Sequence, residues 1–140
     1  MADLTITASQ VQPADLSAHT FEGVAGAAIT AGQPLYKDST DGNALKPADA
    51  DAAASARCVG IAVAGAADGQ PVRYQRTGDV TLGAGAAMTV GTVYVVSATA
   101  GGIAPLADLA SGDYVSILGV AISASVLRLN LLNSEVAVPA

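Results

Sequence analysis

An internal repeat constrains the fold of this 140-residue chain more than any other feature of its sequence. Residues 25–32 (AGAAITAG) are followed 59 positions later by residues 84–91 (AGAAMTVG), and further glycines, threonines and apolar segments match at the same offset. Alanine matches are common in an alanine-rich chain, but matched glycines and threonines at one fixed offset are not. We therefore interpret residues 25–83 and 84–140 as two copies of one supersecondary unit.

Each unit has the pattern of short strands separated by turns. A glycine-containing turn leads into an apolar strand, a second turn follows, and a later strand contains Gly60 in the first unit and Gly119 in the second. Asp68 and Gly69 are typical of a hairpin turn, and residues 77–79 predict another reversal of the chain before a further strand. Short strands bounded by such turns predict an all-β fold, a small barrel or sandwich built from the duplicated unit.

Residues 1–24 precede the repeat and form a predicted N-terminal arm attached to the β domain at residues 25–140. Leu4, Ile6 and Ala8 alternate with polar residues, which is the pattern of a half-buried strand. The rest of the arm is polar and irregular, so we expect it to move more than the β domain. Its first residues lack a basic region followed by an apolar run, so we do not expect a secretory signal.

Charge and hydropathy exclude several classes of partner. The net charge is −6, and the six basic residues are scattered along the chain. Binding to nucleic acid requires clustered Lys and Arg, so we expect no nucleic-acid partner. The apolar runs are too short to span a bilayer, so we expect no membrane partner. A chain with 51% hydrophobic and 13% charged residues can nevertheless form a folded core.

The sequence contains few residues that could act as nucleophiles or bind a transition metal. It has one histidine, His19, and one cysteine, Cys58. A zinc site or a Cys–His pair within one chain is therefore not expected. We interpret His19 as an exposed loop residue and Cys58 as a small buried residue of a strand.

Charged residues give only weak indications of an ion site. Asp38 and Asp41, with Asp49 and Asp51 further on, form the densest acidic set, but they lack the glutamate that completes a calcium loop. We interpret them as solvated turn residues. Arg73 and Arg76 could bind an anion but have the spacing of outward-facing strand residues. We therefore predict no enzyme activity, no cofactor and no metal site.

Three segments of the first unit follow one another in a recognisable order. They are residues 33–40 (QPLYKDST), 58–68 (CVGIAVAGAAD) and 72–80 (VRYQRTGDV). This series resembles the head-decoration (cement) proteins of tailed bacteriophages, of the β-tulip type found on lambda-like capsids. Residues 2–7 (ADLTIT) and 28–34 (AITAGQP) also resemble a broader group of phage cement proteins. The resemblance covers residues 2–82 directly and the second unit through the repeat.

The resemblance implies a β-tulip-like structural protein that binds the outer surface of a phage head and stabilises it against the internal pressure of packaged DNA. The partner would be the major capsid protein, and the chain would form a homotrimer, with a dimer as the alternative that the second unit leaves open. It would be made in the bacterial cytoplasm and reside on the outer surface of the virion. By position, Leu4, Thr5, Ile6 and Thr7 would form a capsid-binding arm that extends a sheet of the capsid protein.

Two other classes of function remain open from the sequence. The first is a β-sandwich adhesion or carbohydrate-binding module, against which stands the absence of tryptophan. Its aromatic residues would be Phe21, Tyr36, Tyr74, Tyr94 and Tyr114. The second is a small trimeric enzyme with sites shared between subunits, against which stands the lack of a dense polar cluster.

Overall fold

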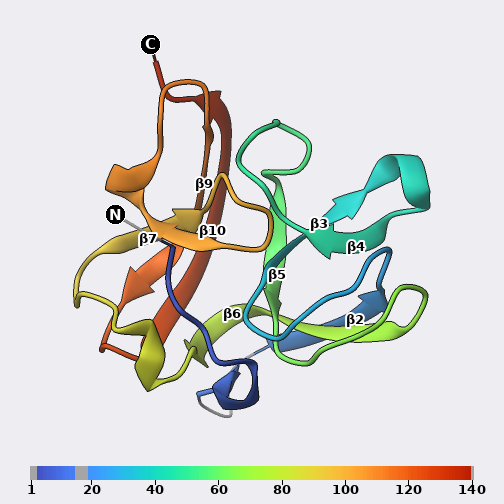
Figure 1. Cartoon of the computed structure of the whole chain (residues 1–140), viewed down its shortest axis with the longest axis horizontal. Coiled ribbons are helices and arrows are strands. Elements are labelled where there is room, and N and C mark those ends of the chain that lie inside the picture. The colour runs from blue at the N-terminus through green and yellow to red at the C-terminus, as the bar shows by residue number, and fades with distance from the viewer. Residues whose placement is uncertain (1–2, 15–18, 140) are drawn as a thin grey trace.

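The computed structural model describes residues 3–14 and 19–139 and shows an all-β chain (Figure 1). The described residues form ten strands in one strongly curled antiparallel sheet, half of a barrel, so the predicted all-β class is confirmed. The strands are β1 Gln12–Pro13, β2 His19–Val24, β3 Pro34–Asp38, β4 Ala44–Pro47, β5 Cys58–Ala62, β6 Pro71–Thr81, β7 Val93–Val96, β8 Ile103–Pro105, β9 Tyr114–Ala121 and β10 Val126–Ala137. Short 3₁₀ turns occupy Ala8–Gln10, Ser39–Asp41, Ala84–Ala86 and Leu106–Asp108. The described residues form no helix of the length and apolar character needed to cross a membrane.

The strands of the two predicted units pair in the same way. The strand order is β4-β3-β5-β6-β10-β9-β7-β8, so the series of the first unit is followed by that of the second in reverse. Leu35 of β3 lies opposite Gly60 of β5, and Tyr94 of β7 lies opposite Gly119 of β9, which is 59 positions later on both strands. The register shifts immediately after this pair in both units.

Glycine is required at the matched position because the neighbouring strand passes very close. A Cβ atom at Gly60 would lie 2.5 Å from the carbonyl oxygen of Gln75 on β6, and one at Gly119 would overlap the carbonyl oxygen of Arg128 on β10. Real Cβ atoms do not approach backbone oxygen this closely. The two glycines therefore have the same structural role, a close backbone approach.

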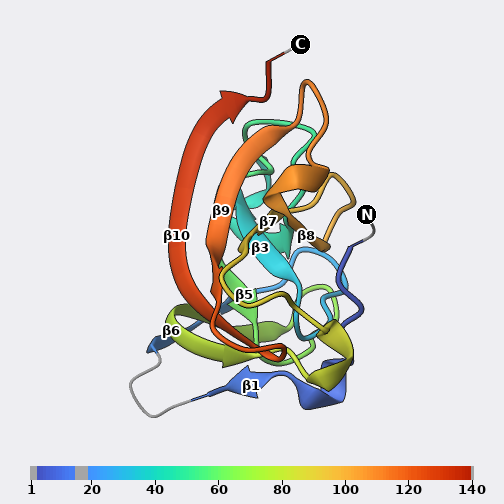
Figure 2. The ribbon, with the colours of Figure 1, turned by 90° about the vertical axis from the view of Figure 1, so that its left-hand side faces the viewer.

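Strand β6 connects the two halves of the sheet. Its first part pairs with β5 and its last part with β10, while β2 and β1 pair with it in succession. Figure 2 shows β6 lying across the base of the long, curved β9 and β10. The strand thus takes part in the hydrogen bonding of both units.

The predicted reversal at residues 77–79 is wrong, because β6 continues through this segment. Gly78 has a φ of 87° and bends the strand without ending it. The side-chain amide of Gln75 donates hydrogen bonds to the carbonyl oxygens of Thr77 and Asp79, at 3.0 and 2.9 Å. These bonds satisfy carbonyl groups around the bend, so the strand can pass from one neighbour to the next.

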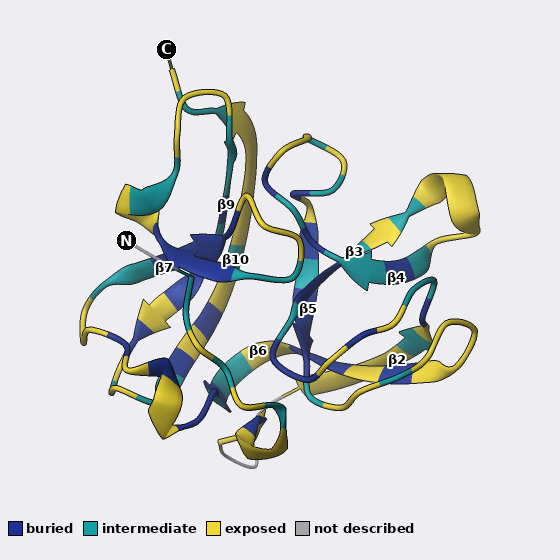
Figure 3. Ribbon diagram, in the orientation of Figure 1, coloured by how far each residue is buried: buried dark blue, intermediate teal, exposed yellow. Residues whose placement is uncertain are grey.

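The buried residues form two clusters (Figure 3). The smaller lies within the curl of the first unit and contains Leu35, Leu45 and Val72. The larger contains second-unit residues such as Ile103 and Leu118, together with residues of β5 and β6. Each of these fully buried side chains stabilises the fold by roughly 1.5–3 kcal/mol.

The second half of β10 contacts β5 through a side chain. The Asn133 amide oxygen accepts a hydrogen bond from the backbone N–H of Cys58 at 3.2 Å, and its amide nitrogen donates to the Cys58 carbonyl at 3.1 Å. The Ser116 hydroxyl donates to the same amide oxygen at 2.6 Å. An ion pair between Arg57 and Glu135 lies beside this contact, at 2.5 Å. Asn133 therefore takes the place of a neighbouring strand for Cys58.

The predicted strand at Leu4, Ile6 and Ala8 is not present, although the predicted alternation of burial is. Leu4, Ile6 and Ala8 are partly buried against the larger cluster, whereas Thr5 and Thr7 are exposed. Residues 3–7 are extended without belonging to a strand, and Ala8–Gln10 form a 3₁₀ turn. The strands of the predicted arm are β1 and β2, both paired with β6.

Candidate functional site

The candidate site is a groove beside the edge of β8, in which the N-terminal segment lies. The N-terminal segment is defined here as residues 3–7. The cavity beside it has a volume of about 250 Å³ and is lined by Leu4 and Ile6 together with residues 30–33 and 101–103. Residues 30–33 lead into β3, and residues 101–102 join β7 to β8. The groove is therefore formed by loops from both units, with the N-terminal segment crossing between them (Figure 1).

Polar contacts hold the start of the segment against β8. The backbone N–H of Leu4 donates a hydrogen bond to the carbonyl oxygen of Ile103 at 2.8 Å. The Asp3 carboxylate accepts one from the hydroxyl of Ser97 at 2.7 Å, and that hydroxyl in turn accepts one from the N–H of Thr99 at 3.0 Å. Ser97 is buried, so the charged hydrogen bond to Asp3 lies partly out of water.

The first unit has an equivalent contact made by a different part of the chain. Leu45 and Ile103 both lie two residues before the proline that ends β4 or β8. The carbonyl of Leu45 accepts a hydrogen bond from the N–H of Gly26 at 2.8 Å, as that of Ile103 does from Leu4. The edge of β4 is thus covered by residues that run directly on from β2, and the edge of β8 by the N-terminal segment.

Two glycines leave the space that the N-terminal segment occupies. A Cβ atom at Gly32 would lie 2.5 Å from Cγ2 of Ile6, and one at Gly102 would overlap the Asp3 carboxylate. Gly91, the counterpart of Gly32 in the second unit, would meet nothing within 4 Å. Any side chain at Gly32 or Gly102 would therefore displace the segment, so the groove is shaped to it.

The four residues predicted as a capsid-binding arm divide between two faces of this segment. Leu4 and Ile6 lie in the groove, and Thr5 and Thr7 face outward. Successive N–H groups of an extended chain point to opposite sides, so the N–H of Thr5 points away from β8 when that of Leu4 points toward it. The sequence did not indicate Asp3, Ser97 or Gly102 as part of the site, because these residues lie far apart along the chain.

The acidic residues considered for calcium are used in local structure. The Asp38 carboxylate accepts a hydrogen bond from Lys46 Nζ at 2.7 Å, and Asp41 lies 3.4 Å from the same nitrogen. The hydrogen bond from Lys46, with further bonds from the side chain and backbone of Thr40, lowers the pKa of Asp38 from 3.8 to about 2. The same pairing raises the pKa of Lys46. Across the described residues, no set of three or more His, Cys, Asp or Glu side chains is placed to hold a metal ion.

The other candidate residues lie apart from the groove. The Asp49 carboxylate accepts a hydrogen bond from the N–H of Asp51 at 2.9 Å within a turn, and Arg73 and Arg76 are exposed on β6. His19 lies in strand β2 and not in the predicted loop. Its Nδ1 is 3.0 Å from the hydroxyl of Thr77.

The lone cysteine is in the core. Cys58 is 2% exposed, and its thiol donates a hydrogen bond to the carbonyl oxygen of Gly60 at 3.3 Å. Burial raises the pKa of the Cys58 thiol to about 12, so the group stays protonated at neutral pH. The predicted buried position of this residue is confirmed.

The aromatic residues considered for sugar binding are divided between core and surface. Tyr74 and Tyr94 are 5% and 2% exposed, so neither can offer a ring face to a ligand. Phe21 is 48% exposed and stacks on Tyr74 with ring centroids 6.0 Å apart. Phe21 thus packs on Tyr74, a member of the smaller core cluster.

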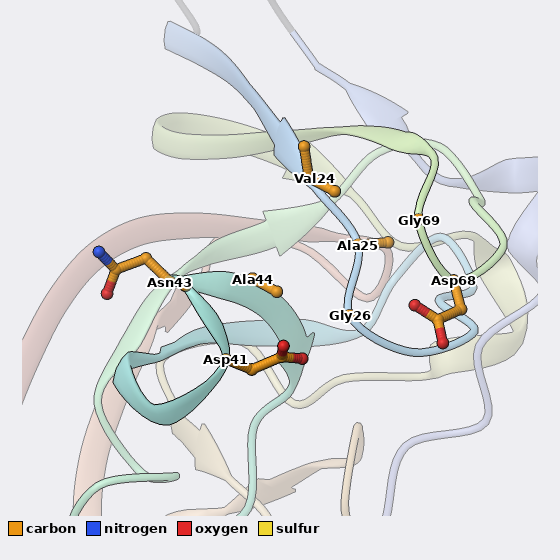
Figure 4. Close-up of a pocket in the computed structure, with 9 residues that line it drawn as sticks. Val24, Ala25, Gly26, Asp41, Asn43, Ala44, Asp68 and Gly69 are labelled. Atoms are coloured by element: carbon orange, nitrogen blue, oxygen red, sulfur yellow. The ribbon is translucent and has the colours of Figure 1, made fainter.

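A second cavity, of about 470 Å³, lies between the end of β2 and the tip of the β3–β4 hairpin (Figure 4). Its walls are mainly glycine and alanine, with the carboxylates of Asp41 and Asp68 on different loops around it. Asp41 also contacts Lys46, which partly neutralises this region.

Comparison with known proteins does not identify the chain: no family model, no curated protein and no solved structure matches it. Its function is therefore inferred from the geometry of the groove and from the sequence resemblance described above.

Proposed function

We propose that this chain is a non-enzymatic decoration protein that binds the outer surface of a tailed-phage head, contacts the major capsid protein and stabilises the head against the pressure of packaged DNA. The observation that carries this proposal is the N-terminal segment, which is fixed to the body through Leu4 and Ile6 and carries exposed side chains at Thr5 and Thr7. It adds to the resemblance of residues 2–82 to phage cement proteins.

The exposed side of the segment is suited to binding another sheet. Thr5 and Thr7 face outward, and threonine is favoured in strands. An extended segment held on its inner side by Leu4 and Ile6 is already ordered, so adding it to the edge of a capsid sheet loses little further conformational entropy. Main-chain hydrogen bonds would supply the affinity and require no special side chain.

The reactive groups of the chain favour a passive role. The Cys58 thiol is buried and protonated, and the Asp38 carboxylate is paired with Lys46. Neither group is in the protonation state and setting that nucleophilic or acid–base chemistry uses at neutral pH. A homotrimer, or alternatively a dimer, would present several segments at once, and such repeated contacts bind strongly through avidity.

The proposal is tested by mixing the purified protein with undecorated, expanded heads of the phage that encodes it and imaging the particles by electron microscopy. We expect added density at fixed positions on the outer surface, and heads that resist heating better than bare heads. Bare heads at saturating protein concentration would refute the proposal.

A matched pair of variants at Thr5 tests the contribution of the N-terminal segment. Thr5→Pro removes the outward N–H while keeping an extended backbone, whereas Thr5→Ala retains the N–H. Loss of a main-chain hydrogen bond costs about 1–3 kcal/mol, so we expect head binding to weaken roughly tenfold or more for Thr5→Pro and to stay near wild type for Thr5→Ala. Equal binding by the two variants in a co-sedimentation assay would show that the segment does not add to a capsid sheet.

A further inference from the structure

We propose that the N-terminal segment protects the edge of the sheet: while residues 3–7 lie in the groove, they prevent β8 from pairing with strands of other molecules. The strand order of the sheet begins with β4 and ends with β8. The outer side of a strand at the end of a sheet can pair with any extended chain that reaches it, which leads to aggregation. This inference concerns the protein in solution and does not depend on binding to a phage head.

The outward backbone groups of β8 belong to Ile103 and Pro105. The carbonyl oxygen of Gly102 points toward β7, where it accepts a hydrogen bond from the N–H of Ser97 at 3.1 Å. The backbone groups of successive strand residues point to opposite sides, so those of Ile103 and Pro105 point away from β7. Proline has no N–H, so Pro105 offers an approaching strand an acceptor but no donor.

The N-terminal segment occupies the outward carbonyl and adds a charge beside it. The N–H of Leu4 donates to the carbonyl oxygen of Ile103 at 2.8 Å. The Asp3 carboxylate, which accepts a hydrogen bond from the Ser97 hydroxyl at 2.7 Å, lies against Gly102 just before β8 begins. An approaching strand would have to displace both contacts. Charged groups at a sheet edge oppose pairing with another chain, so the carboxylate strengthens the protection.

The edge of β4, at the other end of the strand order, has the same combination of features. The N–H of Gly26 occupies the carbonyl of Leu45 at 2.8 Å, as that of Leu4 occupies the carbonyl of Ile103. In both strands a proline follows two residues after the covered carbonyl and ends the strand. The covering residues come from different parts of the chain, yet the outcome at the two edges is the same. This repetition supports protection of the edge as the role of the cover.

Aggregation of variants in which the segment is displaced tests the proposal on the full chain. Leu4→Pro removes the N–H that covers the Ile103 carbonyl, whereas Thr5→Pro removes an N–H that points away from β8. Gly102→Ala displaces the segment from the other side, because its Cβ atom would overlap the Asp3 carboxylate. The proteins are shaken in urea below their unfolding transitions, and the growth of β-aggregates is followed by thioflavin T fluorescence.

We expect Leu4→Pro and Gly102→Ala to aggregate several times faster than wild type, and Thr5→Pro to aggregate at the wild-type rate. Asn133→Ala is the control for lost stability, because Asn133 binds Cys58 and is not among the residues that line the groove. Each protein is measured at the urea concentration that gives all of them the same free energy of unfolding. Equal aggregation rates for Leu4→Pro, Gly102→Ala and Asn133→Ala would overturn the proposal.

A lysine placed beside β8 tests whether the aggregates form through this edge. Leu106 directly follows Pro105 and is 42% exposed, and Val136 on β10 is 62% exposed. Leu106→Lys and Val136→Lys make the same change of charge and each remove an exposed apolar side chain, but β10 pairs with β9 and β6 and not with β8.

In the Leu4→Pro background, we expect Leu106→Lys to slow aggregation several times more than Val136→Lys does, because lysine at a sheet edge blocks pairing. Equal slowing by the two lysines would show that the aggregates form through another surface, and would refute protection of the β8 edge.

Discussion

Gly60 and Gly119 show that the same position must lack a side chain in both units. At each position, a Cβ atom would collide with a backbone carbonyl of the next strand. The neighbouring backbone cannot move without breaking the strand pairs β5–β6 and β9–β10. The requirement is therefore set by the neighbouring backbone at both positions, and at Gly60 the Tyr74 ring, 2.7 Å from the Cβ position, adds to it.

Substitution of either glycine by alanine should destabilise the protein. We expect Gly60→Ala and Gly119→Ala each to lower the free energy of unfolding by about 1–3 kcal/mol, measured by urea denaturation. Gly85→Ala is the control, because its nearest neighbours would lie at 3.6 Å or more, and we expect a change within about 0.5 kcal/mol. Unfolding curves for the two variants that coincide with that of Gly85→Ala would contradict the close approach.

The ion pair of Asp38 and Lys46 predicts how stability depends on pH. The folded pKa of Asp38 is about 2, below the ordinary value of 3.8, so its contribution is complete above the ordinary value and is lost as the pH falls toward 2. Asp38→Asn should lower the melting temperature at pH 7, and the difference from wild type should shrink between about pH 4 and pH 2. Asp68→Asn, on an exposed turn, serves as the control. A difference in melting temperature that stays constant from about pH 4 to pH 2 would exclude the pairing of Asp38 with Lys46.

Strand β6 shows which part of the fold the sequence predicts and which it does not. The sequence predicted a strand after residues 77–79, but it interpreted these residues, Gly78 among them, as a reversal of the chain. A glycine with positive φ is compatible with a reversal or with a bend, and the choice depends on neighbours that are distant in sequence. Here β10 pairs with the residues after Gly78, and the Gln75 amide binds the carbonyls beside it, so the strand continues.

The N-terminal segment shows the same limit of prediction from sequence, here at the edge of the sheet formed by β8. Alternation correctly indicated that Leu4, Ile6 and Ala8 face the body. It could not show that the single backbone bond to Ile103 replaces a full strand ladder. The groove depends on Gly32 and Gly102, whose positions in space follow from the pairing of β7 with β8 and of β3 with β5.

The contact of β10 with β5 depends on one side chain and is open to test. We expect Asn133→Ala to lower the free energy of unfolding by about 1–3 kcal/mol, because the N–H and carbonyl of Cys58 lose their side-chain partner. Asn130→Ala, an exposed position on the same strand, should change it by less than about 0.5 kcal/mol. Equal stability of the two variants in urea would show that water replaces the Asn133 amide without loss.

At the scale of the whole molecule, the two units share strands and a core. β6 pairs with strands of both units, and Cys58 and Ile61 of β5 are buried in the cluster that second-unit residues dominate. The repeat allowed the strand order of one unit to be inferred from the other. It could not show that the units would be joined through β6, because that pairing has no counterpart within a single unit.

The shared strand predicts that the units unfold together. We expect one cooperative transition, with coincident thermal curves from far-ultraviolet circular dichroism and from tyrosine absorbance. Fragments 25–83 and 84–140 should each lack a stable fold, because separation leaves β6 and β10 without one partner. Two resolved transitions, or a folded fragment, would show that the units are independent.

The groove also has a consequence for how the chain folds while it is being synthesised. Residues 3–6 are synthesised before the strand that they cover, Ile103–Pro105, which follows about a hundred residues later. At a translation rate of about 5–20 residues per second, roughly 5–20 s pass before Leu4 and Ile6 can pack into the groove. During this interval Leu4 and Ile6 are apolar side chains without their packing partners, and transiently exposed apolar surface of this kind favours aggregation of nascent chains.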